Sequence, residues 1–113
     1  MSSANHMEDL HGACAIVTGA AQGLGYAVAK AYVGEGMRVA LMDVQADRLA
    51  AVADELKQSG GDCLAIPVDL ADAEATQAAI QQALNHYGTP RVLVHNAAIL
   101  NVKPLLDVSL REW

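Results

Sequence analysis

Three glycines spaced as G-x-x-x-G-x-G place the tightest limit on how this chain can fold. Gly19, Gly23 and Gly25 follow the apolar run 13–17 and precede a helix-like run that begins near residue 23. Such a turn lets backbone N–H groups approach a pyrophosphate at the positive end of a helix. Glycine is needed because a Cβ would block that approach or forbid the backbone angles. The pattern therefore predicts a strand, a phosphate-binding turn and a helix.

Strand-like and helix-like runs alternate along the rest of the chain. The expected strands cover 13–17, 38–43, 63–69 and 92–95, and the expected helices cover 23–33, 47–57 and 72–87. Pro67 cannot donate a ladder hydrogen bond, which places the third strand at an edge of the sheet. Asp72 is expected to cap the helix that follows it. The residues expected to face inward from the first helix are Leu24, Ala27, Val28, Ala31 and Tyr32.

This alternation predicts an α/β fold with right-handed crossovers and a parallel sheet. We expect the strand order 3-2-1-4 with flanking helices, which is a Rossmann-type three-layer architecture truncated after four strands. The order reverses between strands 1 and 4, so the binding crevice should lie at their carboxyl ends.

Composition removes several classes of function. The net charge is −6 and the seven Lys and Arg residues are scattered, so we expect no nucleic-acid partner. No run resembles a membrane span, and residues 1–11 look like a flexible polar leader rather than a signal peptide. Cys14 and Cys63 are expected to be buried free thiols, which favours a reducing, cytoplasmic compartment. The four histidines show no ligand spacing, so no metal site is expected.

Asp43 ends the second predicted strand, 18 residues after Gly25 (43 − 25). A carboxylate at that place accepts the hydrogen bonds of an adenosine ribose, and it repels a 2′-phosphate. No Arg or Lys in the turn offsets that repulsion, so NAD is favoured over NADP. The alternative role for Asp43 is a solvated acid or a cap for the next helix.

Two further polar residues end strands. Asp69 follows strand 3, where it could bind the adenine amine or serve as an N-cap partner for the next helix. Asn96 follows strand 4, where it could line the cofactor, hold neighbouring strand backbones or make only local hydrogen bonds.

The segments 18–25, 68–70 and 96–98, together with Asp43, resemble the short-chain dehydrogenase/reductase family in its classical type. The resemblance runs from about residue 10 to 113 and implies a partial NAD-binding Rossmann domain over 12–113. The cofactor-binding residues that it implies are Gly19, Ala21, Gln22, Gly23, Leu24, Gly25, Asp43, Val44, Asp69, Leu70, Asn96, Ala97 and Ala98.

The chain departs from the family pattern at the Asn-Asn-Ala-Gly loop. His95 replaces an asparagine with a structural role, and Ala98 replaces the glycine. A role for His95 as a catalytic acid is the less favoured interpretation. Tyr26 and Lys30 match the family's Tyr-x-x-x-Lys pair by spacing alone, because they lie on the first helix. The resemblance thus places no catalytic residue within these 113 positions.

The resemblance implies an oxidoreductase that transfers hydride between NAD and a small alcohol or carbonyl substrate. The C-terminal catalytic half is expected beyond residue 113, so this portion alone should be inactive and strand 4 should expose an edge. The full-length protein is expected to be a homo-oligomer, either a tetramer or a dimer. The alternative hypothesis is a non-catalytic nucleotide-binding module, if residue 113 is the true C-terminus. A third hypothesis is an α/β domain that binds no ligand.

Overall fold

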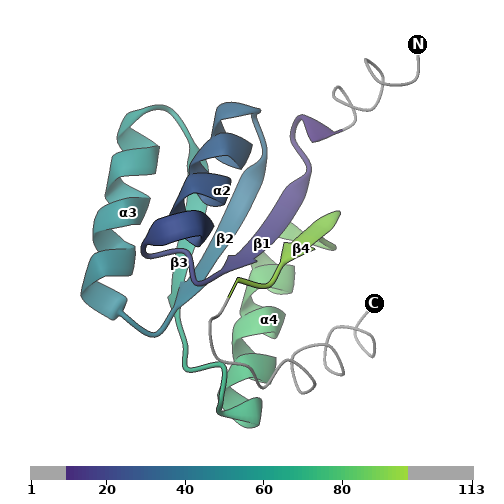
Figure 1. Ribbon diagram of the computed structural model, residues 1–113. Coiled ribbons are helices and arrows are strands. Elements are labelled where there is room, and N and C mark those ends of the chain that lie inside the picture. Colours follow the sequence, from purple (N-terminus) through teal and green to yellow (C-terminus); the bar gives the residue numbers. More distant parts are fainter. Residues whose placement is uncertain (1–9, 97–113) are drawn as a thin grey trace.

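A computed structural model describes residues 10–96, in which strands and helices alternate (Figure 1). The elements are β1 (Cys14–Thr18), α2 (Gly23–Gly34), β2 (Arg38–Asp43), α3 (Ala46–Gln58), β3 (Asp62–Pro67), α4 (Ala73–Tyr87) and β4 (Val92–Val94). Each predicted strand and helix is present within about two residues of its expected limits. Ala97, Ala98 and residues 1–9 of the predicted polar leader lie outside the described residues.

The four strands form one parallel sheet in the order β3-β2-β1-β4, as predicted. Ile16 of β1 is in register with Ala40 of β2 on one side and with Leu93 of β4 on the other. After β3 the chain crosses back to place β4 on the other side of β1, so the strand order reverses at the boundary between β1 and β4. Pro67 lies at the end of the edge strand β3, where its missing N–H interrupts no ladder.

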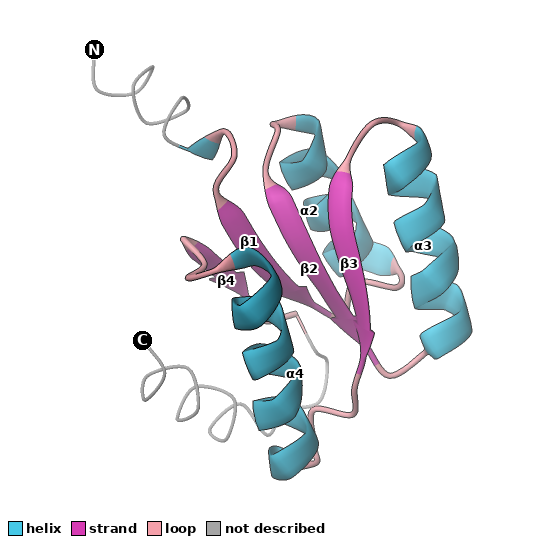
Figure 2. Cartoon of the chain, turned by 180° about the vertical axis from the view of Figure 1, so that it is seen from behind, coloured by secondary structure: helices cyan, strands magenta, loops and turns pink. Residues whose placement is uncertain are grey.

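Helices cover both faces of the sheet, which confirms the three-layer α/β architecture. Figures 1 and 2 show α2 and α3 on one face and α4 on the other. Along β1, Ala15 and Val17 belong to the core beneath α2 and α3, whereas Cys14 and Ile16 belong to the core beneath α4. Both faces of β1 are buried because successive side chains of a strand point to opposite sides.

The orientation of α2 agrees with the prediction only in part, since Val28 and Tyr32 are partly buried against the core as expected. Leu24 is 68% exposed, and Ala27 and Ala31 are also exposed, whereas Gly25 and Ala29 are the buried residues. Almost every residue of this helix is apolar or small, so its sequence marks no single inward stripe. Close packing of Gly25 against the glycine turn sets the rotation of the helix instead.

The predictions about the cap of α4 and the two cysteines agree with the structure. The side chain of Asp72 caps α4 by accepting a 3.0 Å hydrogen bond from the Ala75 N–H. Cys14 and Cys63 are free and buried. Within the described part of the chain, none of the helices combines the length and apolar character that crossing a bilayer requires.

Candidate functional site

Backbone angle and close packing restrict the three glycines of the turn between β1 and α2 in different combinations. Gly19 and Gly23 have positive φ angles of 65° and 62°, which L-residues with side chains rarely adopt. A Cβ on Gly19 would lie 2.6 Å from the Asn96 carbonyl oxygen, and a Cβ on Gly25 would overlap the Gly19 carbonyl. At Gly23, by contrast, nothing lies within 4 Å of the Cβ position. The turn is thus closed on its inner side and open above Gly23.

The first turn of α2 has no side-chain cap. Gln22 occupies the N-cap position in an extended conformation, but its side chain makes no capping hydrogen bond, and no acidic residue follows it in the first turn. In α4, Asp72 fills the same position and does cap the helix. Free N–H groups and the positive end of a helix dipole are what a phosphate requires. The residues at this end of α2 therefore fit a pyrophosphate.

The carboxylate of Asp43 ties the glycine turn to the end of β2. Its Oδ2 accepts a 3.0 Å hydrogen bond from the Ala21 N–H, and its Oδ1 accepts a 2.9 Å bond from the Gln45 N–H. Gln45 is the N-cap residue of α3, so the helix-cap alternative is realised in part. Each carboxylate oxygen keeps a further lone pair, and Asp43 is only partly buried. The group can accept two hydroxyl groups without losing either backbone bond.

The neighbouring predicted positions have different environments. Val44 is 64% exposed beside Asp43, whereas Leu70 is partly buried against the core beneath α4. Asp69 is exposed, and its Oδ1 accepts a 3.0 Å bond from the Ala71 N–H. That bond closes a local turn before α4 and differs from the N-cap contact weighed as the alternative, because Asp72 caps α4. It leaves the second carboxylate oxygen without a described partner.

Thr18, at the end of β1, joins the turn to β4. Its hydroxyl accepts a 2.8 Å hydrogen bond from the Asn96 N–H and lies 3.3 Å from the Val94 carbonyl oxygen and 3.2 Å from His95 Nδ1. The imidazole of His95 thus enters the network that an asparagine was expected to fill. Burial lowers the pKa of His95, which favours the neutral ring. Thr18 places Asn96 directly against Gly19.

The Tyr26 and Lys30 pair lies on the flank of α2 that faces α3. Tyr26 Oη donates a 2.6 Å hydrogen bond to Glu55 Oε2, and Lys30 Nζ lies 3.9 Å from the same oxygen. This hydrogen bond to Glu55 raises the pKa of Tyr26. A proton-transferring Tyr needs the opposite shift, so the geometry agrees with a match by spacing alone.

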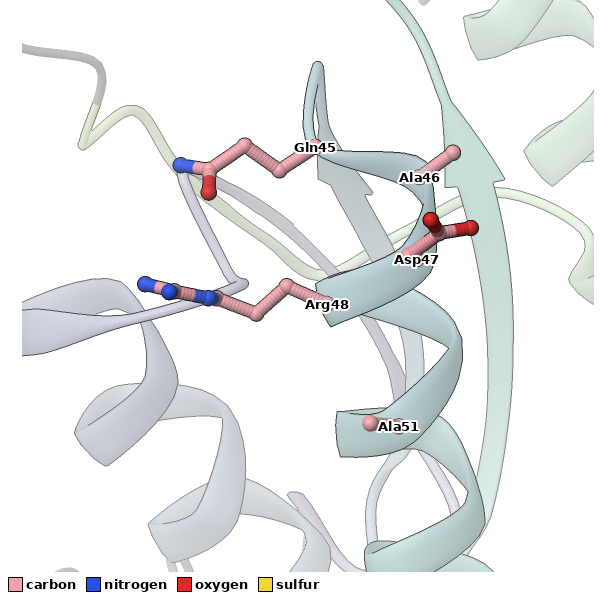
Figure 3. A pocket seen from close by; sticks show the side chains of 5 residues that line it. All are labelled: Gln45, Ala46, Asp47, Arg48 and Ala51. Carbon is pink, nitrogen blue, oxygen red and sulfur yellow. The ribbon is translucent and has the colours of Figure 1, made fainter.

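One charged residue of this region was not singled out from the sequence. Arg48, in the first turn of α3, donates a hydrogen bond from Nη1 to Gln22 Oε1. Figure 3 shows the open pocket beside it, which is lined by Gln45, Ala46, Asp47, Arg48 and Ala51. The signal available in the sequence was a cation five residues after Asp43 (48 − 43). The glycine turn itself contains no Arg or Lys, but Arg48 of α3 brings a positive charge to it.

Taken together, a parallel sheet with a glycine turn at its reversal point defines a Rossmann-type nucleotide-binding class of domain. The family model for short chain dehydrogenases matches residues 13–113, and the chain belongs to that family.

Its relatives include D-threitol dehydrogenase of Mycolicibacterium smegmatis, which is 36% identical over 104 residues, and sorbitol dehydrogenase of Cereibacter sphaeroides, which is 35% identical over 104 residues. Each alignment covers 92% of this chain and 40% of the relative. The chain therefore spans about two fifths of the length of these curated relatives.

Solved structures show the same likeness. A short-chain dehydrogenase/reductase from Serratia marcescens superposes with a TM-score of 0.83 at 34% identity, over 90% of this chain and 51% of the other. Another, from Burkholderia phymatum and in complex with NAD, has a TM-score of 0.73 at 31% identity, over 74% of this chain and 30% of the other.

Proposed function

We propose that this chain forms the NAD-binding part of an oxidoreductase that transfers hydride between NAD and a small alcohol or carbonyl compound. The observation that carries the proposal is the Asp43 carboxylate, which is held against the glycine turn by the Ala21 N–H. Family membership and the relatives named as threitol and sorbitol dehydrogenases support the reaction class.

Each part of the site has a distinct task in this proposal. The uncapped N-terminus of α2 and the open space above Gly23 receive the pyrophosphate. Asp43 accepts the two hydroxyl groups of the adenosine ribose, while the exposed Val44 offers an apolar surface to the adenine. Asp69 faces the adenine amine with its remaining carboxylate oxygen. Bound NAD supplies the hydride acceptor at its nicotinamide ring.

Asn96 is the proposed boundary of the nicotinamide end. Its main chain is held by Thr18 and lies against Gly19, so a rigid polar residue stands where β1 and β4 diverge. Ala97 and Ala98 would continue this border. The groups that move the substrate proton are proposed to come from the additional length that the curated relatives have.

We also propose a reducing compartment, such as the cytoplasm, because the two cysteines described in the structure are free and buried. A homo-oligomer is proposed for the whole protein on the strength of the family resemblance. The alternative function is a nucleotide-binding module without catalysis. The coding sequence after residue 113 separates the two, because an enzyme needs a Ser followed by a Tyr-x-x-x-Lys pair there.

Calorimetric titration with NAD and NADP tests the cofactor assignment. The wild-type protein should bind NAD at least about tenfold more tightly than NADP, since repulsion between Asp43 and a 2′-phosphate of about 1.4 kcal/mol is enough for that ratio. Asp43→Ala should weaken NAD binding and bring the ratio of the NADP and NAD dissociation constants closer to one. Asp54→Ala, which removes an exposed carboxylate from the middle of α3, is the matched control and should leave the ratio unchanged. An unchanged ratio in Asp43→Ala would refute the assignment.

A further inference from the structure

Arg48 and Asp43 reach the glycine turn at adjacent residues. The Arg48 guanidinium donates to the side chain of Gln22, and the Asp43 carboxylate accepts from the N–H of Ala21. Two groups of opposite charge are thus anchored on consecutive positions of one turn. In the proposed function Asp43 holds the adenosine ribose, and Arg48 reaches the residue of the turn that follows the one bound by Asp43.

The positive charge of Arg48 is available to a ligand. Arg48 is exposed, and no carboxylate of residues 10–96 lies within ion-pair distance of it. Figure 3 shows the side chains of Arg48 and Gln45 extending to the same side of α3, while the carboxylate of Asp47 points away from them. The acceptor that holds Arg48 is a neutral amide. A phosphate dianion competes well with such an acceptor, because it adds the attraction between two full charges and can accept two parallel hydrogen bonds from the guanidinium.

We infer that Arg48 determines cofactor specificity by offsetting the repulsion that Asp43 exerts on a 2′-phosphate. The guanidinium leaves Gln22 and pairs with the phosphate, so that NADP is discriminated against less strongly than Asp43 alone would achieve. The inference rests on the proposed nucleotide site. Its chemistry is specific: Arg48 recognises the 2′-phosphate and contributes nothing to a ribose with two free hydroxyl groups.

Adenosine 5′-monophosphate (AMP) and adenosine 2′,5′-bisphosphate (2′,5′-ADP) are suitable probes, because they differ only in the 2′-phosphate. Their dissociation constants should be measured calorimetrically with the purified wild-type protein and with Arg48→Gln. The substitution should raise the dissociation constant of 2′,5′-ADP by about fivefold to tenfold, as expected for the loss of an exposed charge pair with good geometry. The affinity for AMP should stay within about twofold. The loss should shrink as salt is raised, since exposed charges are screened.

Two further variants separate a local contact from a change in overall charge. Lys57→Gln removes the same unit charge from the other end of α3, nine residues away. At about 1.5 Å per residue, that is roughly 14 Å along the helix, more than a Debye length of about 10 Å at 0.1 M salt. Lys57→Gln should therefore leave both constants unchanged. Arg48→Lys keeps the charge without the planar fork and should restore part of the 2′,5′-ADP affinity.

The outcomes are distinct. The inference is supported if Arg48→Gln loses affinity for 2′,5′-ADP alone and Arg48→Lys restores part of that affinity. An equal loss of affinity for both probes overturns the inference, because Arg48 would then act on the adenosine or on the turn itself. No change in either constant overturns it as well. If the wild-type protein binds neither AMP nor NAD, the proposed function fails, and this inference fails with it.

Discussion

Replacing Thr18 by Val tests whether the β1–β4 junction depends on one hydroxyl group. Thr18 is fully buried, and Val has nearly the same shape, so packing should survive the substitution. The Asn96 N–H and His95 Nδ1 would both lose the hydroxyl as a partner. A buried polar group left without a partner costs about 1–3 kcal/mol. Because His95 and Asn96 are only partly buried, water can replace some of this loss, and we expect about 2 kcal/mol in total.

Urea unfolding followed by circular dichroism measures this change. With a typical slope of about 2 kcal/mol per molar urea, the midpoint should fall by roughly 1 M. Thr18→Ser is the matched control, because it keeps the hydroxyl and removes a methyl group worth about 1 kcal/mol. NAD affinity should fall in Thr18→Val but not in Thr18→Ser. A Thr18→Val protein within about 0.5 kcal/mol of wild type would refute the reasoning, because unsatisfied groups at this junction should cost more than that.

Three other predictions follow from single contacts. Gly25→Ala should weaken NAD binding at least about tenfold, since a Cβ forces the turn open, whereas Gly34→Ala, with nothing within 4 Å, should bind normally and gain up to about 1 kcal/mol; calorimetry and thermal melting measure both. Because burial lowers the pKa of His95 in the folded chain, the unfolded chain takes up that proton first, and stability should decline below about pH 6.5. Urea midpoints between pH 5 and 7 should decline less steeply in His95→Gln, and an identical slope would contradict the assignment. Burial, then a 2.5 Å hydrogen bond to Asp62, raises the pKa of Tyr87, so stability should fall above about pH 10, where the unfolded chain ionises. Tyr87→Phe should lose about 1 kcal/mol at pH 7 and show a smaller alkaline decline; an equal decline would show that other groups cause it.

Local patterns were sufficient to predict the sheet and most of its helices. Apolar runs of strand length, separated by amphipathic runs, allow little besides a parallel sheet with right-handed crossovers. Asp72 could be identified as a helix cap because its effect is confined to the next three residues. Pro67 indicated an edge strand for an equally local reason, its missing donor.

The rotation of α2 could not be predicted in the same way. Leu24 was expected to face inward because it belongs to a set of apolar residues at helical spacing, yet it is 68% exposed. Gly25 contributes no hydrophobic signal but is buried against the Gly19 carbonyl and the side chain of Asn96. A contact between residues 25 and 96 depends on two strands meeting in the sheet, which no window of local sequence contains.

The sequence by itself determined the class of fold, the glycine turn and the acid that ends β2, because each depends on short-range spacing. Tertiary structure decided what these residues touch. It placed the Asp43 carboxylate on the Ala21 N–H and the Arg48 guanidinium on Gln22, contacts that span more than 20 residues of the chain. The physical reason is that crossovers bring the carboxyl ends of parallel strands to one edge of the sheet, where charges that are distant in sequence become neighbours.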